Sequence, residues 1–139
     1  MIVLDTNILS ELMRPIPEPR VVAWLAAQPA ASVFVTTVTQ AELLYGVAVL
    51  PAGRRRVKLE GAVAGMLQED FAGRLLPFDG AAAHAYAAIA AERRLAGRPI
   101  SQFDAQIAAI CRSRAADLAT RNTADFEGCG IQVVNPWDS

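Results

Sequence analysis

IVLDTNILSELM, residues 2–13, predicts the first folding unit of the chain and the polar junction on which its function is expected to depend. Residues 2–4 form a short apolar run that is typical of a buried strand, and Asp5-Thr6-Asn7 follows as a polar turn. Apolar side chains then recur at helical spacing, at Ile8, Leu9, Leu12 and Met13. The order is therefore strand, turn and helix, with an acid at the end of the strand.

The same alternation of short apolar runs and helical patterns continues to the end of the chain. The further expected strands are 32–37, 74–78, 117–120 and 131–134. The further expected helices are 21–25, one from about residue 39 to residue 50, 57–67, 81–96 and 101–111. Such a pattern predicts an α/β fold, a three-layer α/β/α sandwich with a short five-stranded parallel sheet covered on both faces. We expect one domain, residues 1–139, in which the helices before and after Pro51 form a helical hairpin and a natural dimer surface.

Composition narrows the class of protein further. The chain is 53% hydrophobic but has no uninterrupted apolar stretch of the roughly 18 residues that a membrane span requires. No charged leader followed by an apolar segment opens the chain, so we expect a soluble cytoplasmic protein without membrane contact. Cys111, Cys129 and a single histidine, His84, provide too few soft ligands for a zinc site. His84 lies in an alanine-rich helical pattern, so we expect this histidine to have a structural role.

Charge is unevenly distributed along the chain. The formal net charge is only −1, yet basic residues cluster at 54–58, 93–98 and 112–114. These clusters suit either contacts with phosphates or solvated helix faces, and the sequence leaves both interpretations open. The mean hydropathy of +0.28 indicates apolar surface that a partner or a second copy would cover.

Four acids stand at junctions between predicted elements: Asp5, Glu42, Asp104 and Asp125. Ligands of a parallel sheet bind beyond the carboxyl ends of the strands, where the strand order reverses. If the four carboxylates converge there, they form an oxygen-only site that suits a hard cation such as Mg²⁺ or Mn²⁺. Cations of this kind mostly serve phosphoryl chemistry, so the pattern predicts a metal-dependent nuclease.

Each acid also has a purely structural interpretation. Thr39 to Glu42 matches a helix capping box, and Ser101 to Asp104 and Asn122 to Asp125 share its spacing loosely. Asp5 could simply stabilise the dipole of the first helix. The two interpretations are compatible, because the partial positive charge of helix N-termini lowers the cost of gathering carboxylates.

In its motifs the chain resembles the PIN-domain nucleases, specifically the VapC and FitB-like toxins of bacterial toxin–antitoxin pairs. The resemblance spans essentially the whole length: the opening IVLDTN, the AELLYG helix, Asp104, the segment TRNTADF and the closing VVNPW. It implies that Asp5, Glu42 and Asp104 hold Mg²⁺ or Mn²⁺ and that a fourth acid completes the pocket. Some relatives have Asp where this chain has Asn122, so the fourth ligand is either Asp125, which we favour, or water with the Asn122 amide.

The resemblance also implies roles for nearby polar residues and an activity. Thr120 would place the fourth ligand with Asn122 as hydrogen-bonding support, and Thr6 and Asn7 would shape the pocket. The expected activity is that of an endoribonuclease hydrolysing RNA phosphodiesters to leave 5′-phosphates. Expected partners are the RNA substrate, a cognate antitoxin, a second copy in a homodimer, and operator DNA only through the antitoxin.

Two other functions compete with this one. A FitAB-like protein could act chiefly as the stable partner of a DNA-binding antitoxin, with weak or vestigial cleavage. Phosphotransfer proteins also place Asp after the first strand, but phosphatases of this type require a second acid where Asn7 stands. Receiver domains need a lysine near a late strand, and the only lysine is Lys58, in a middle helix. No glycine-rich phosphate loop occurs either.

Overall fold

One parallel sheet organises the computed structural model, which describes residues 1–139. Its strands are β1 (Ile2–Leu4), β2 (Val33–Thr36), β3 (Leu75–Leu76), β4 (Asp117–Ala119) and β5 (Val133–Val134). They lie in the order β3-β2-β1-β4-β5, and every neighbouring pair is parallel. In the register at the centre of the sheet, Val3 pairs with Phe34 on one side and Leu118 on the other. The predicted short, five-stranded parallel sheet is confirmed.

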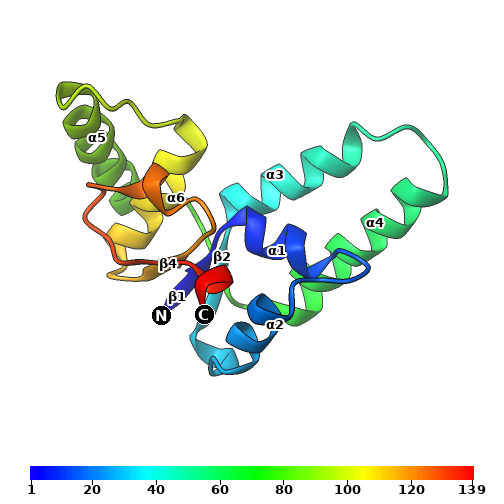
Figure 1. Cartoon of the computed structure of the whole chain (residues 1–139). Helices are drawn as coiled ribbons and strands as arrows, with labels where there is room; N and C mark the ends of the chain where they lie inside the picture. The colour runs from blue at the N-terminus through cyan, green and yellow to red at the C-terminus, as the bar shows by residue number, and fades with distance from the viewer.

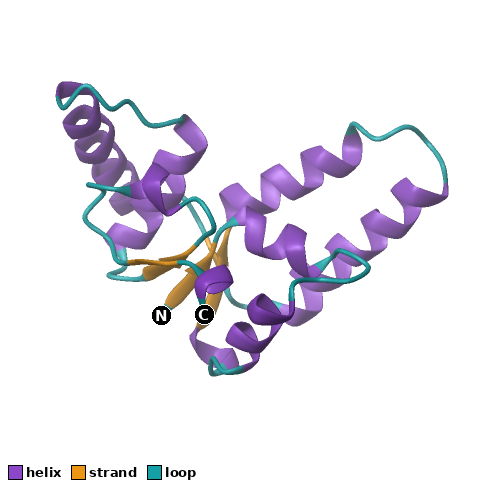
Figure 2. Ribbon diagram, in the orientation of Figure 1, coloured by secondary structure: helices purple, strands orange, loops and turns teal.

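Six α-helices cover the sheet: α1 (Thr6–Leu12), α2 (Pro19–Ala26), α3 (Thr37–Ala48), α4 (Arg54–Gly65), α5 (Gly80–Leu95) and α6 (Gln102–Ser113). Short helical turns complete the chain: η1 (Ala30–Ser32), η2 (Met66–Asp70), η3 (Thr123–Phe126) and η4 (Pro136–Asp138). Helices α5 and α6 lie on one side of the strands, and α1 to α4 lie on the other (Figures 1 and 2). None of these helices combines the length and apolar character needed to cross a membrane.

Two separate apolar cores, one on each face of the sheet, hold the three layers together. Successive strand residues point to opposite faces. Val3 and Leu118 therefore join the core beneath α5 and α6, whereas Leu4 and Ala119 join the core beneath the other four helices. All four of these side chains are fully buried. The predicted α/β/α sandwich is confirmed, and the strand ends are held firmly enough to position side chains at the edge of the sheet.

The predicted hairpin of two helices is also confirmed. Helices α3 and α4 contact one another and extend together away from the sheet (Figure 1). Large apolar side chains on the hairpin are exposed, namely Leu44, Tyr45, Val49 and Val57. The use of this surface in a homodimer stays a prediction.

The start of α3 differs from the expected one. The sequence predicted a helix beginning near Thr39, with Thr39 as its cap. Instead, Thr36 is the N-cap, and its Oγ1 accepts a hydrogen bond from the Thr39 N–H at 3.1 Å. Several threonines here suit a cap, and the end of β2 at Thr36 determines which one is used. Thr39 is consequently inside the helix and fully buried.

Candidate functional site

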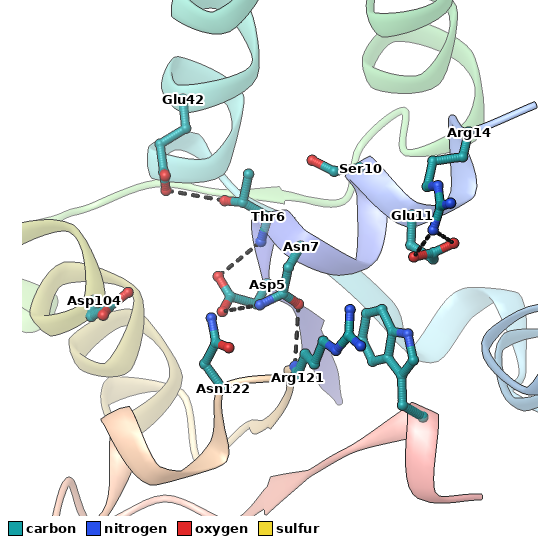
Figure 3. A pocket seen from close by; sticks show the side chains of 11 residues that line it. Asp5, Thr6, Asn7, Ser10, Glu11, Arg14, Glu42, Asp104, Arg121 and Asn122 are labelled. Carbon is teal, nitrogen blue, oxygen red and sulfur yellow. Dashed lines mark hydrogen bonds and ion pairs between the residues drawn. The ribbon is translucent and has the colours of Figure 1, made fainter. Parts of the chain in front are cut away.

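A polar cavity of about 500 Å³ opens at the carboxyl ends of the central strands (Figure 3). The sheet order runs outward from β1 in both directions, so the strand order reverses between β1 and β4. The segments that follow these two strands line the cavity, as expected for a parallel sheet. Its walls are formed by Asp5, Thr6, Asn7, Ser10, Glu11, Arg14, Glu42, Asp104, Arg121, Asn122 and Trp137.

Asp5 lies at the base of this cavity, directly after β1, and only 5% of its surface is exposed. One carboxylate oxygen, Oδ1, accepts a hydrogen bond from the Thr6 N–H at 2.8 Å and so caps α1. The other, Oδ2, accepts from the Thr120 hydroxyl at 2.7 Å. The structural role expected for Asp5 at the first helix is confirmed, and the same contacts fix the carboxylate in the cavity.

Glu42 reaches the cavity from the second turn of α3. The Thr6 hydroxyl oxygen lies 3.0 Å from Glu42 Oε1 and 3.0 Å from Thr39 Oγ1. A hydroxyl has one hydrogen to donate and can accept from another donor, so Thr6 can donate to the carboxylate while accepting from Thr39. The predicted capping box is therefore wrong, because the Glu42 carboxylate pairs with Thr6 of α1 and the cap of its own helix is Thr36.

Asp104 faces the cavity from the opposite layer, in the first turn of α6. The Ser101 hydroxyl caps this helix by accepting a hydrogen bond from the Asp104 N–H at 3.2 Å, which confirms the predicted cap. Asp104 is partly buried, and its carboxylate stands across the cavity from Glu42 and Asp5 (Figure 3). Three acids from three elements far apart in sequence thus share one cavity.

Thr120 ties the ends of β1 and β4 together beneath the cavity. Its side chain is fully buried, and besides donating to Asp5 its oxygen accepts from Asn7 Nδ2 and from the Asn122 N–H, both at 3.1 Å. Asn7 Oδ1 in turn accepts from the Arg121 N–H at 3.2 Å. The predicted polar residues Thr6, Asn7, Thr120 and Asn122 are all in this network, and all but Thr120 line the cavity.

Burial and neighbouring carboxylates raise the pKa values of all three acids. Burial raises the pKa of Asp5 most, the charges of Asp104 and Asp125 raise it further, and the hydrogen bonds from Thr120 and Thr6 oppose the shift. Burial likewise raises the pKa of Glu42 and of Asp104, with added contributions from neighbouring carboxylates. The donor set is composed of oxygen atoms, which suits a hard divalent cation. As the side chains stand, no three His, Cys, Asp or Glu residues lie close enough together to hold one ion.

Asp125 does not line the cavity, whereas Asn122 does. Asp125 is exposed in η3. Its negative charge contributes to the raised pKa values of Asp5 and Asp104. Its backbone carbonyl accepts a hydrogen bond at 2.9 Å from Arg93, a buried arginine of α5. Asn122 makes no side-chain capping bond to η3, so the loose capping pattern predicted there is wrong.

Five cavity residues were not expected from the sequence: Ser10, Glu11, Arg14, Arg121 and Trp137. The sequence pattern could have indicated Glu11 and Arg14, because with Asn7 they recur every three or four residues and so form a polar stripe on α1. Glu11 is buried and accepts hydrogen bonds from Arg14 and from the Glu18 N–H at 3.0 Å. Arg121 and Trp137 lie in separate segments, and no local pattern joins them.

Comparison with known proteins identifies the family. The PIN-domain family model matches residues 2–128. The chain is 40% identical over 138 residues to VapC ribonuclease Y4jK of Sinorhizobium fredii, covering 99% of each chain. It is 40% identical over 137 residues to toxin FitB of Neisseria gonorrhoeae, again covering 99% of each.

Solved structures agree with the sequence relatives. A structure of FitAB bound to an IR36 DNA fragment superimposes with a TM-score of 0.92 at 39% identity, covering 99% of this chain and 96% of that one. The structure of FitAcB from Neisseria gonorrhoeae gives a TM-score of 0.90 at 39% identity over the full length of both chains. The resemblance drawn from the sequence motifs is confirmed.

Proposed function

Because this chain belongs to the PIN-domain family, we propose that it is a metal-dependent endoribonuclease acting as the toxin of a toxin–antitoxin pair. One observation carries the proposal: Asp5, Glu42 and Asp104, from three separate elements, line a single polar cavity beside two arginines. A structural role alone gives no reason to bury Asp5 and Glu42 near other carboxylates whose charges raise their pKa values. Relatives named as a ribonuclease and as a toxin support the same activity.

Asp5, Glu42 and Asp104 would hold the cation, Mg²⁺ or Mn²⁺, directly or through water. The fourth position belongs to Asp125, as favoured from the sequence, or to Asn122, which lies at the cavity wall. When bound, the cation would supply a more acidic water and positive charge for the phosphate. The fit rests on the donor chemistry, since every candidate ligand offers oxygen.

The remaining site residues keep these ligands in place. Thr120 and the Thr6 N–H fix both oxygens of Asp5, and the Thr6 hydroxyl orients Glu42. Asn7 bridges Thr120 and the Arg121 backbone, which joins the two strand ends that form the cavity. Groups that orient metal ligands typically change metal affinity or activity by about 10- to 100-fold when removed.

We further propose a cognate antitoxin as the partner, with operator DNA bound only through it, and a homodimer formed through the α3–α4 hairpin. The similar FitAB structure bound to DNA supports the first part. The exposed Leu44, Tyr45, Val49 and Val57 support an apolar contact on the hairpin.

Cleavage of RNA by the purified chain tests the proposal. With Mg²⁺, we expect new 5′-phosphate ends in cellular RNA, their loss on addition of EDTA, and at least about 100-fold slower cleavage in Asp5→Asn. Asp117→Asn, which changes an exposed acid of β4, is the matched control and should cleave normally. EDTA-insensitive cleavage that survives Asp5→Asn would refute the scheme.

The similar DNA-bound structure also favours a second function, that of an antitoxin-bound partner with weak or vestigial cleavage. Comparing RNA cleavage by the isolated chain with that by its antitoxin complex separates the two. Cleavage that appears only without the antitoxin supports the toxin, and an absence of cleavage in both preparations supports the binding role.

A further inference from the structure

We propose that Arg121, stacked on Trp137 at the wall of the cavity, binds a backbone phosphate of the RNA strand next to the phosphate that is cleaved. This inference deepens the proposed function and rests on it. It assigns a substrate contact to a residue outside the four acids. It also gives the short C-terminal turn η4 a role at the site.

Arg121 is held in place by contacts from two directions. The Arg121 guanidinium carbon lies 5.0 Å from the centroid of the Trp137 ring, within the range of a cation–π contact. Trp137 is itself nearly buried, with 8% of its residue surface exposed, and its backbone N–H donates to Asn135 Oδ1 at 2.9 Å. Asn135 Nδ2 donates to the Arg121 carbonyl at 3.5 Å, so η4 and the loop after β4 are joined.

The backbone of Arg121 connects this arrangement to the acids. Its N–H donates to Asn7 Oδ1 at 3.2 Å, and Asn7 Nδ2 lies 3.4 Å from Asp5 Oδ2. One intermediate side chain therefore separates Arg121 from the central carboxylate. These bonds fix the Arg121 backbone relative to Asp5, and the Trp137 ring holds the exposed side chain beside the cavity.

Arg121 is the arginine of the cavity that has no anionic partner. The other, Arg14, donates to both carboxylate oxygens of Glu11 at 3.1 Å. No carboxylate lies within ion-pair distance of Arg121, and its guanidinium makes no hydrogen bond to another residue. The guanidinium N–H groups of Arg121 therefore remain free, and such groups match the oxygens of a phosphate.

The two ends of the cavity carry opposite charge. In Figure 3, Asp104 and Glu42 lie to one side of Asp5, and Arg121 and Arg14 lie to the other. An RNA strand carries a negative charge at every nucleotide, and uncompensated acids would repel it. A cationic side chain near the acids favours a phosphate adjacent to the reacting one, and the unpaired Arg121 provides it.

RNA binding by variants of the full chain tests this role. All proteins carry Asp104→Asn to keep the RNA intact, and fluorescence anisotropy follows a short labelled single-stranded RNA of random sequence across a range of salt concentrations. The variant is Arg121→Gln. The matched control is Arg94→Gln, which removes an exposed arginine of α5 that likewise has no carboxylate partner. Urea unfolding checks that both variants fold.

We expect Arg121→Gln to weaken RNA binding roughly tenfold and to reduce the salt slope by about 0.7, the value for one phosphate contact on a single strand. Arg121→Lys should recover most of the slope, because it keeps the charge. An affinity and slope equal to those of Arg94→Gln in folded Arg121→Gln would overturn the inference. Cleavage is measured separately, on the chain without Asp104→Asn. If that chain cleaves RNA but Arg121→Gln does not weaken binding, only the phosphate contact is refuted. If Arg121→Gln weakens binding as expected but the chain does not cleave RNA, only the nuclease activity is refuted.

Discussion

Replacing Thr120 by valine should expose how strongly the buried Asp5 carboxylate depends on one hydroxyl. The substitution keeps the shape of a fully buried side chain and removes the oxygen that donates to Asp5 Oδ2 at 2.7 Å. The same oxygen accepts from Asn7 Nδ2 and the Asn122 N–H, so three hydrogen bonds are lost together. The metal-free protein is therefore expected to be less stable and to depend more strongly on pH.

The expected loss of stability follows from the hydrogen bond between Thr120 and Asp5. A hydrogen bond to a charged group contributes roughly 1.5 to 3 kcal/mol, and the Asn7 and Asn122 donors lie near the open cavity where water can replace the lost acceptor. Near neutral pH, the free energy of unfolding should thus fall by about 2 to 3 kcal/mol. Thr37→Val removes the same atom at a position without a side-chain hydrogen bond, and it should change stability by no more than about 0.5 kcal/mol.

The pH dependence has a definite sign. The pKa of Asp5 is raised in the folded protein, so the ionised carboxylate lowers stability above that pKa, and this penalty disappears as the pH falls through it. The Thr120 hydrogen bond opposes the rise, and removing it raises the Asp5 pKa further. The loss caused by Thr120→Val should therefore be largest near neutral pH and shrink as the pH falls, because the carboxyl is already protonated when the pH reaches the ordinary range of aspartate, about 4.

Urea unfolding in EDTA at several pH values measures both quantities. A stability loss in Thr120→Val no greater than that in Thr37→Val near neutral pH would show that the Thr120 hydroxyl does not stabilise the ionised Asp5. A difference between the two variants that stays constant down to about pH 4 would show that the loss does not depend on the charge of Asp5.

Three further outcomes are expected. Asp104→Asn should abolish RNA cleavage yet leave the metal-free protein equally or more resistant to heat near neutral pH. Burial raises the pKa of this acid, and the neutral amide removes the cost of burying its charge. A marked fall in the melting temperature would instead favour a purely structural role. Ala115→Gly should stabilise the chain by about 0.5 to 1 kcal/mol in urea unfolding, since Ala115 has a φ of 52° after α6, and a loss of stability would contradict this. Arg93→Met should lower the free energy of unfolding by about 3 kcal/mol and speed amide hydrogen exchange in residues 122–129. The buried guanidinium donates to the backbone carbonyls of residues 98, 125 and 127. Unchanged exchange would show that other contacts hold this loop.

The sheet and the acidic half of the site could be predicted because both follow from local pattern. Short apolar runs such as residues 2–4 and 117–120 end abruptly at polar residues, and parallel strands place all such ends on one edge. Once the strands were assigned, topology placed Asp5 at this edge, whereas the site roles of Asn7 and Thr120 came from the family resemblance. Asp104 could be placed because Ser101 is a strong helix cap.

The other half of the site depends on contacts between distant segments. Arg121 is fixed by a tryptophan 16 positions further along and by Asn7 near the start of the chain, and no periodicity joins them. The cap of α3 was misplaced because Thr36 and Thr39 are chemically equivalent candidates. Only the pairing of β2 with its neighbours decides between them.

The position of β4 between β1 and β5 decides when the sheet can be completed during synthesis. This strand lies beside β1, although more than 110 residues separate them along the chain, so β1 has an open edge until the C-terminal quarter has been synthesised. Pairing over such a sequence distance is slow, since a long loop must close first. A ribosome-bound fragment that ends before Thr120 holds Asp5 without its hydroxyl partner and has neither Arg121 nor Trp137. Translation is thus nearly finished before the proposed ribonuclease site can be complete.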